Sequence, residues 1–382
     1  MAITGNLKNL EYKISMKSLY DISWKCSEPE YRADPALSYS TLAKYERKGR
    51  FNALPTLFER DSSPSLTFGS LVDCLLTGTK EEFDAQFLVA EFPKLSDTLM
   101  LIANTLFARY GRAVDEVDEM FGDAHFFATV EEIPDAYLSE IGKQCDFWAN
   151  SKWDNVRAKK IREGGIGEYY KLLILADGKE VINQKDVDDA YAAAEALKTS
   201  DNTGFYFAPN NTEADGIERL YQLKFKGEDP ISHTKFRCMA DLIVVDYNKK
   251  TIQPVDLKTS SHNEWEFHKS MVDWRYDLQA RLYWRLIKQN IEKDEFFKDF
   301  TLLPYKFIVV NRINLQPQVW DFPLTQAEGT IKLETARGGM YVWRDPYVIG
   351  EELAYYLSNP ECKTPREMSK SNNIIDFLKN NI

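Results

Sequence analysis

Two aspartates and a lysine on neighbouring predicted strands have the types and spacing of a metal-dependent hydrolytic site. Asp241 lies in the apolar run MADLIVV, and Asp256 and Lys258 lie one residue apart in QPVDLKTSS. The two runs are joined through DYNKKT, and a hairpin turn centred between Asn248 and Lys249 places Asp241 directly opposite Asp256. Lys258 shares the face of Asp256 because side chains alternate along a strand.

Two facing carboxylates repel each other, and this repulsion raises the pKa of one of them unless a cation lies between them. A hard divalent ion with oxygen ligands relieves the repulsion. Mg²⁺ or Mn²⁺ bound by Asp241 and Asp256 can bridge a phosphate, supply a water nucleophile and stabilise the leaving oxygen, while Lys258 holds the water or offsets developing charge. The alternative is a solvated Asp-Lys ion pair on the outer face of a strand.

Residues elsewhere in the chain favour the metal site over the ion pair. Gln279 and Tyr283 are four residues apart and share one face of a predicted helix. Asp73 falls in an apolar helical turn of SLTFGSLVDCLLTG, far upstream. A lone carboxylate such as Asp241 is also costly to bury in an apolar run.

The elements that must position these residues predict a mixed α/β (α+β) fold, with a sheet flanked by helices. Twofold periodicity predicts three successive strands in IERLYQLKFKG, TKFRCMADLIVVDYN and KTIQPVDLKTS, and two more in LPYKFIVVNR and QPQVWDFPL. Helical spacing predicts helices after Ser38 or Ser40, in SLTFGSLVDCLLTG up to Gly78, over residues 183–201, in NEWEFHKSMVDWRYDLQARLYWRLIKQNI and in IGEELAYYLSNP. We expect one domain over residues 1–382, a helical insertion or cap over 93–170, and a loosely held tail over 360–382.

With these residues in order, the chain resembles the PD-(D/E)XK nuclease superfamily in its RecB-type branch, and most closely the RecE-like exonuclease VIII proteins of phages and prophages. The resemblance covers about residues 36 to 290. Its segments are LSYSTLAKYE, FGSLVDCLLTG, GKEVINQKDVDDAYAAAEAL, RLYQLKF, FRCMADLIVVD, VDLKTSS and YDLQARLYW.

The resemblance implies a restriction-endonuclease-like core and a metal-dependent exonuclease that resects linear duplex DNA from 5′ ends, leaving 3′ single strands for recombination. It implies that Asp241 and Asp256 are metal ligands, that Lys258 is the catalytic lysine, and that Gln279 and Tyr283 form the QxxxY helix beside the DNA end. Asp73 stands where the closest relatives usually have a histidine that ligates a metal, and an aspartate also supplies an oxygen ligand to Mg²⁺ or Mn²⁺.

The implied partners are duplex DNA ends and a single-strand annealing protein, with a homo-oligomeric ring as a further expectation. Two alternatives stay open: a structure-specific or single-strand nuclease of the same fold, and a weakened, non-cleaving DNA-binding module. A net charge of -11 argues against binding a polyanion through the average surface but leaves local basic patches open.

Composition indicates an ordinary globular chain, with 44% apolar and 28% charged residues and no apolar run long enough to span a bilayer. We therefore expect no membrane partner and a cytoplasmic location in a bacterial or phage-infected cell. The five cysteines are dispersed and show no zinc or iron-sulfur spacing.

A basic aromatic stretch and one further acid are additional candidates. The stretch from Phe147 to Lys171 either tracks a DNA backbone or is a helix with a solvated charged face. Glu218, at the start of a predicted strand, is either an additional acid of the site or a surface strand end. The DNA-contact candidates in the stretch are Lys152, Arg157, Lys159, Lys160 and Arg162.

Overall fold

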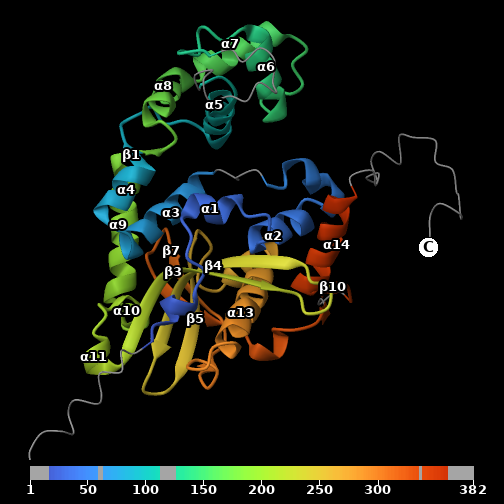
Figure 1. Ribbon diagram of the computed structural model, residues 1–382. Helices are drawn as coiled ribbons and strands as arrows, with labels where there is room; N and C mark the ends of the chain where they lie inside the picture. Colours follow the sequence, from blue (N-terminus) through green and yellow to red (C-terminus); the bar gives the residue numbers. More distant parts are fainter. Residues whose placement is uncertain (1–16, 59–62, 112–125, 335–337, 360–382) are drawn as a thin grey trace, which may run out of the picture. The chain divides into compact units, whose positions relative to one another are not determined.

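The computed structural model describes residues 17–58, 63–111, 126–334 and 338–359 (Figure 1). The expected loose tail over 360–382 lies outside these residues. The chain divides into two compact units, and each is described separately. Unit 1 comprises Met1–Glu59, Ser200–Asn311 and Gln316–Ile382, and unit 2 comprises Arg60–Thr199 and Arg312–Leu315.

Unit 1 is a mixed α/β structure around a central sheet that is six-stranded in the described part of the chain. Its elements are η1 (Leu19–Ile22), α1 (Glu28–Ala33), α2 (Tyr39–Arg47), η2 (Arg50–Thr56), α10 (Gly204–Phe207), α11 (Thr212–Asp215), β3 (Ile217–Glu228), β4 (Lys235–Asp246), β5 (Thr251–Ser260), α12 (Phe267–Asp273), α13 (Tyr276–Glu292), β6 (Thr301–Leu302), β7 (Lys306–Asn311), β8 (Pro317–Asp321), η4 (Leu324–Gln326), β9 (Ile331–Glu334), β10 (Met340–Trp343) and α14 (Pro346–Ser358).

The strand order of the central sheet is β3-β4-β5-β7-β8, and β6 also pairs with β5. The β3, β4 and β5 strands form an antiparallel meander, β5 and β7 are parallel, and β7 and β8 are antiparallel. The parallel pair requires a crossover connection, which α12 and α13 provide. The prediction of a central mixed sheet flanked by helices is confirmed, and each predicted strand and helix of this unit is present.

The α13 helix packs in the interior of unit 1. Its apolar residues recur at the helical spacing in Leu278, Leu282 and Leu286, which are fully buried in one core with residues of β3, β4 and β7. The charged residues Asp277 and Arg281 lie four residues apart on another face of the helix, and they are buried too. The helix is therefore largely enclosed by protein before its last turn, and its buried polar residues need partners inside unit 1.

The arginines of α13 find a partner at the start of α14. The side chain of Asp345 caps α14 by accepting from the backbone N–H of Tyr347 at 2.9 Å, and it accepts from both terminal nitrogens of Arg285, at 2.7 and 2.6 Å. The guanidinium of Arg281 lies 3.3 Å from the same carboxylate, and it also lies 3.6 Å from the carboxylate of Asp277. Buried ion pairs thus join one face of α13 to the N-terminus of α14.

Unit 2 is mainly helical. Its elements are α3 (Pro64–Thr77), α4 (Lys80–Gln86), β1 (Phe87–Val89), α5 (Asp97–Tyr110), α6 (Asp135–Gln144), α7 (Asp154–Glu163), α8 (Ile166–Ala176), β2 (Glu180–Ile182) and α9 (Gln184–Thr199). The β1 and β2 strands form a short parallel pair. Helix α3 ends at Gly78, as predicted, and α9 matches the predicted helix over 183–201.

The insertion expected over 93–170 lies inside this unit, which has wider bounds because α3, α4 and α9 belong to it as well. Unit 2 has a hydrophobic core of its own. Its residues lie between Leu95 and Val181 and include apolar side chains of α5 to α8. None of the helices within the described ranges is long and apolar enough to cross a membrane.

A glycine in α6 lets a buried arginine enter the core of unit 2. A Cβ atom on Gly142 would come within 2.8 Å of Cδ of Arg157 and 3.0 Å of Cδ1 of Ile161. Replacing a helical glycine by alanine ordinarily stabilises a helix by about 1 kcal/mol. We expect Gly142→Ala to destabilise the protein instead, by about 1–3 kcal/mol, because the core is overpacked.

Urea unfolding followed by circular dichroism measures this effect. The matched control is Gly167→Ala in α8, where the nearest atom to the added Cβ is the flexible carboxylate of Glu131 at 3.4 Å. Gly167→Ala should leave stability unchanged or raise it. Equal effects of the two substitutions would contradict the tight packing around Arg157.

Candidate active site

The β4-β5 hairpin has the register that the sequence predicts. The paired residues run from Asp246 with Thr251 to Leu242 with Val255, so the next position places Asp241 opposite Asp256. Here the backbone ladder ends, and the side chain of Asp241 takes its place by accepting from the N–H of Leu257 at 2.9 Å. Asp241 is therefore held at the point where β4 and β5 separate.

Two local features accompany this separation. On the other side of Asp241, the β3-β4 ladder places Gln222 opposite it, and Gln222 has a positive φ of 54°. Residues other than glycine rarely adopt a positive φ, and this backbone conformation distorts the strand locally. On the β5 side, the segment at Leu37 pairs with β4 in place of β5. The N–H of Leu37 donates to the carbonyl of Lys235 at 3.0 Å, and the carbonyl of Leu37 accepts from the N–H of Arg237 at 2.9 Å.

Asp256 and Lys258 lie on the face of β5 that packs against α13. The parallel register aligns Asp256 with Phe307 and Lys258 with Val309, and both β7 residues belong to the core around α13. Asp256 is fully buried and forms an ion pair with Lys258 through Oδ2. Its other oxygen, Oδ1, accepts a hydrogen bond from Nε2 of Gln279.

The electrostatics of the group show an excess of negative charge. Burial raises the pKa of Asp256 well above its usual value; the ammonium of Lys258 acts in the opposite direction, and the adjacent Asp241 adds to the rise. Burial by itself would lower the pKa of Lys258, but the negative charge and hydrogen bond of Asp256, together with Tyr276 and Asp241, outweigh burial, and the net direction is upward. Two carboxylates and one ammonium leave the ionised group one positive charge short of neutrality.

A cavity of about 170 Å³ opens beside this group. Gln279 and Tyr283 of α13 line it together with Asp241. Burial raises the pKa of Tyr283 well above its usual value, so its phenol is neutral near pH 7. The remaining lining residues are Tyr31, Arg32, Ser38, Ser40, Arg237 and Met239.

The donor atoms at this cavity fit a hard divalent cation. The carboxylate of Asp241 and the side chain of Gln279 line the cavity, with Asp256 adjacent, and Oε1 of Gln279 is buried and has no hydrogen-bond partner in the described structure. Mg²⁺ and Mn²⁺ prefer such ligands. Among the described residues of unit 1, no third carboxylate, histidine or cysteine joins the pair.

The structure thus brings together Asp241, Asp256, Lys258, Gln279 and Tyr283 in unit 1. Asp73 lies on α3 of unit 2, half-buried, and its role as a metal ligand stays a prediction. Glu218 lies elsewhere on β3, where it accepts from Ser18 at 2.8 Å and from Tyr247 at 2.6 Å. Its carboxylate is therefore engaged in joining η1 to the sheet, four positions along the strand from the residue opposite Asp241.

The five basic residues predicted to contact DNA differ in accessibility. Arg157 is fully buried, and its guanidinium donates to the backbone carbonyls of Trp148, Ala149 and Ser151, so it is not available to a phosphate in this arrangement. In this arrangement Arg157 has a structural role, and its contact with DNA stays a prediction. Lys152 and Lys159 are exposed, and Lys160 and Arg162 are half-buried.

Sequence reasoning missed the cavity's arginines. Arg237 lies four residues before Asp241 on β4, and the strand period of two places both on one face. That spacing was a usable signal. Arg32 lies in a different element, α1, and nothing in the local sequence connects it to the strands.

Comparisons with known proteins add no family assignment, since no family model matches the chain and no curated protein matches its sequence.

Proposed function

We propose that this protein is a Mg²⁺- or Mn²⁺-dependent deoxyribonuclease of the PD-(D/E)XK type, acting as an exonuclease on linear duplex DNA. The observation that carries the proposal is the group in which half-buried Asp241 and fully buried Asp256 meet beside Lys258 and Gln279. The antiparallel hairpin, the parallel β7 and the crossover helix α13 support a restriction-endonuclease-like core.

In this proposal, Asp241, Asp256 and Oε1 of Gln279 hold the ion, which when bound supplies an activated water and stabilises the leaving oxygen. Gln279 fixes the orientation of the Asp256 carboxylate through its hydrogen bond to Oδ1. Lys258 carries a positive charge at the edge of the group, with Nζ 4.9 Å from the ring centroid of Tyr276. The ammonium can donate to the nucleophile or to a phosphoryl oxygen.

The arginines of the cavity provide the complement to a phosphodiester. Arg237 is buried, its Nε has no hydrogen-bond partner in the described residues, and its Nη1 lies 3.8 Å from the carboxylate of Asp34. A guanidinium with a free donor, in the cavity that Asp241 also lines, suits a phosphate that bridges a metal and a cation.

Incubation with end-labelled DNA tests the proposal. Linear duplex, nicked circular and closed circular DNA are incubated with Mg²⁺, with Mn²⁺ and with EDTA, and products are separated on a denaturing gel. We expect degradation of the linear duplex with either metal, none with EDTA, and intact closed circles. Asp256→Asn, prepared in parallel, should show no activity and excludes a contaminating nuclease.

The gel also separates the alternatives. Cutting of nicked circles or single strands in preference to duplex ends would replace the exonuclease with a structure-specific nuclease. Binding without metal-dependent cleavage would indicate a non-cleaving module. Labels at the 5′ or the 3′ end test the proposed 5′ resection, and Asp73→Ala in the same assay tests whether that carboxylate contributes to metal use.

A further inference from the structure

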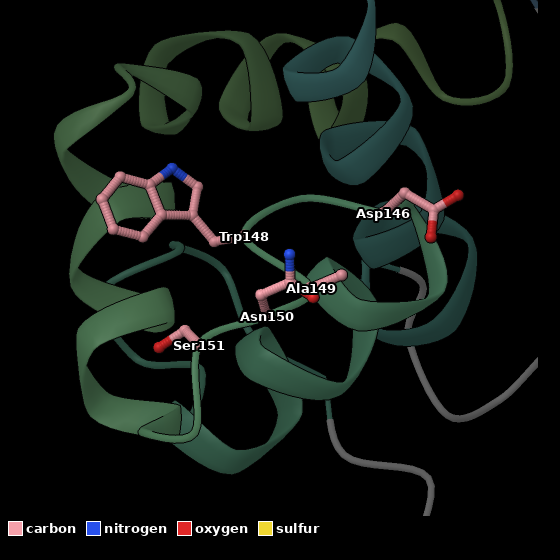
Figure 2. A pocket seen from close by; sticks show the side chains of 5 residues that line it. All are labelled: Asp146, Trp148, Ala149, Asn150 and Ser151. Carbon is pink, nitrogen blue, oxygen red and sulfur yellow. The ribbon is translucent and has the colours of Figure 1, made fainter.

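A hollow on the surface of unit 2 is lined by one exposed tryptophan, and a second one lies a few residues later in the sequence. The hollow has a volume of about 530 Å³ and is formed by the segment between α6 and α7. Figure 2 shows the indole of Trp148 at one end and Asp146 at the other, with Ala149 and Asn150 between them. Trp148 is 50% exposed and Trp153, at the start of α7, is 70% exposed. Two tryptophans this exposed and this close in sequence are unusual on a surface without a partner.

The segment is held in place from below by Arg157. The buried guanidinium donates to the carbonyl of Trp148 from Nε at 3.2 Å and from Nη2 at 3.0 Å, and it also contacts the carbonyl of Ser151. Asp146 and Trp148 have positive φ values of 56° and 50°, which cost free energy for residues with a side chain. The chain thus uses a buried charge to keep Trp148 in an otherwise unfavourable conformation.

The segment around the hollow is rich in lysine and arginine, in a chain that is acidic overall. Between Lys143 and Lys171 there are seven lysines and arginines against four aspartates and glutamates. Lys160 has its Nζ 5.8 Å from the ring centroid of Trp148 and pairs with Glu163 at 2.8 Å. Lys159, which is exposed, also lies 3.7 Å from that glutamate. The acids nearby are Asp146, Asp154 and Glu163, and Asp154 is engaged by Ser139, Lys143 and Arg157.

We propose that this surface, formed by Trp148, Trp153, Lys152, Lys159 and Lys160, binds single-stranded DNA. Bases stack on the two indoles and the lysines contact the phosphates, the combination that sequence-independent single-strand binding requires. A duplex does not suit the surface because its base faces are already stacked on one another. The choice of DNA as the nucleic acid rests on the proposed nuclease function; the stacking chemistry itself does not.

Fluorescence anisotropy of the full-length protein with a labelled oligo-dT of about 20 nucleotides tests the proposal. EDTA is present throughout, so the measurement does not depend on whether the chain cleaves DNA. We expect Trp148→Ala and Trp153→Ala each to weaken binding by at least about fivefold, which corresponds to loss of one stacked base. Trp148→Phe should retain most of the affinity, since a phenyl ring still stacks.

Tyr191→Ala is the matched control because Tyr191 is an aromatic residue of the same unit, on α9, and 54% exposed. It should bind oligo-dT like the unchanged protein. The proposal is overturned if both tryptophan variants keep full affinity, if Tyr191→Ala loses as much as they do, or if they lose blunt duplex binding to the same extent. An oligo-rU bound more tightly through the same tryptophans would overturn the assignment to DNA.

Failure of this test and failure of the nuclease proposal are distinguishable. If the tryptophan variants bind oligo-dT normally while the unchanged protein degrades linear duplex, only the single-strand surface is wrong. If binding depends on the tryptophans and no DNA is degraded, only the nuclease assignment is wrong. Circular dichroism of each variant verifies that unit 2 remains folded.

Discussion

Asp241→Asn should abolish metal-dependent DNA cleavage and, at the same time, stabilise the metal-free protein. The amide removes one of two ligand charges, and loss of such a transition-state contact costs on the order of 10²–10³-fold in rate or more. It also removes the repulsion between Asp241 and the buried Asp256, while an amide oxygen can still accept from the N–H of Leu257. Relief of a directly opposed like-charge pair is worth roughly 1 kcal/mol.

The pH dependence of the stabilisation identifies its origin. Asp256 has a folded-state pKa above its unfolded value, so in the metal-free protein its ionisation opposes folding as pH rises above the unfolded pKa of about 4. The advantage of Asp241→Asn should therefore be absent below about pH 4 and grow as the pH rises above it. Thermal unfolding in EDTA at several pH values, beside a cleavage assay with Mg²⁺, measures both effects.

The matched control is Asp246→Asn on the same strand. Asp246 accepts from the backbone N–H of Lys249 at 2.9 Å and pairs with its ammonium at 2.9 Å, away from the cavity. This change should lower stability slightly and leave cleavage intact. A destabilised Asp241→Asn, or one with full activity, would contradict the site as described.

Asp345→Ala should have the largest effect on stability, with a loss of about 3 kcal/mol, because it leaves buried Arg285 without its carboxylate and buried Arg281 with only the more distant Asp277. Arg285 would lose both of its contacts to Asp345, Arg281 would lose its contact at 3.3 Å, and α14 would lose the side chain that caps Tyr347. Urea unfolding measures the loss. If the variant does not fold, Asp345→Asn, which keeps the cap and one acceptor, provides the measurable intermediate.

Asp321→Ala is the control for removing an ion-paired aspartate. Asp321 pairs with Lys306 on β7, but its side chain is mostly exposed, so the cost should stay below about 1 kcal/mol. A similar loss in both variants would show that the buried network around Asp345 contributes little beyond an ordinary surface pair.

The strands and the register around the candidate site were predictable because they depend on local sequence. Alternation in KTIQPVDLKTS fixes which side chains share a face, and the short turn fixes the pairing of Asp241 with Asp256. The four-residue spacing of Gln279 and Tyr283 fixes their common helix face. These rules hold over short distances in the chain, and the structure follows them.

Features that depend on distant segments were not predictable. Arg157 looks like a surface cation among lysines, and only the carbonyls of the segment from Trp148 to Ser151 show why it is buried. Asp345 is more than sixty residues from Asp277 and was not recognised as a partner of α13. The bounds of unit 2 likewise follow from packing between α3 and α9, which are separated by most of the unit.

The enclosure of α13 has a consequence for the timescale on which the candidate site can rearrange. One face of the helix presents Gln279 to Asp256, and another is tied by arginines to the start of α14. Fraying or partial opening of the helix would expose buried charges, so its amides should exchange with solvent only when unit 1 unfolds as a whole. The spacing between Gln279 and the carboxylates is then set once, at folding, and a substrate meets a site that is already in its final geometry.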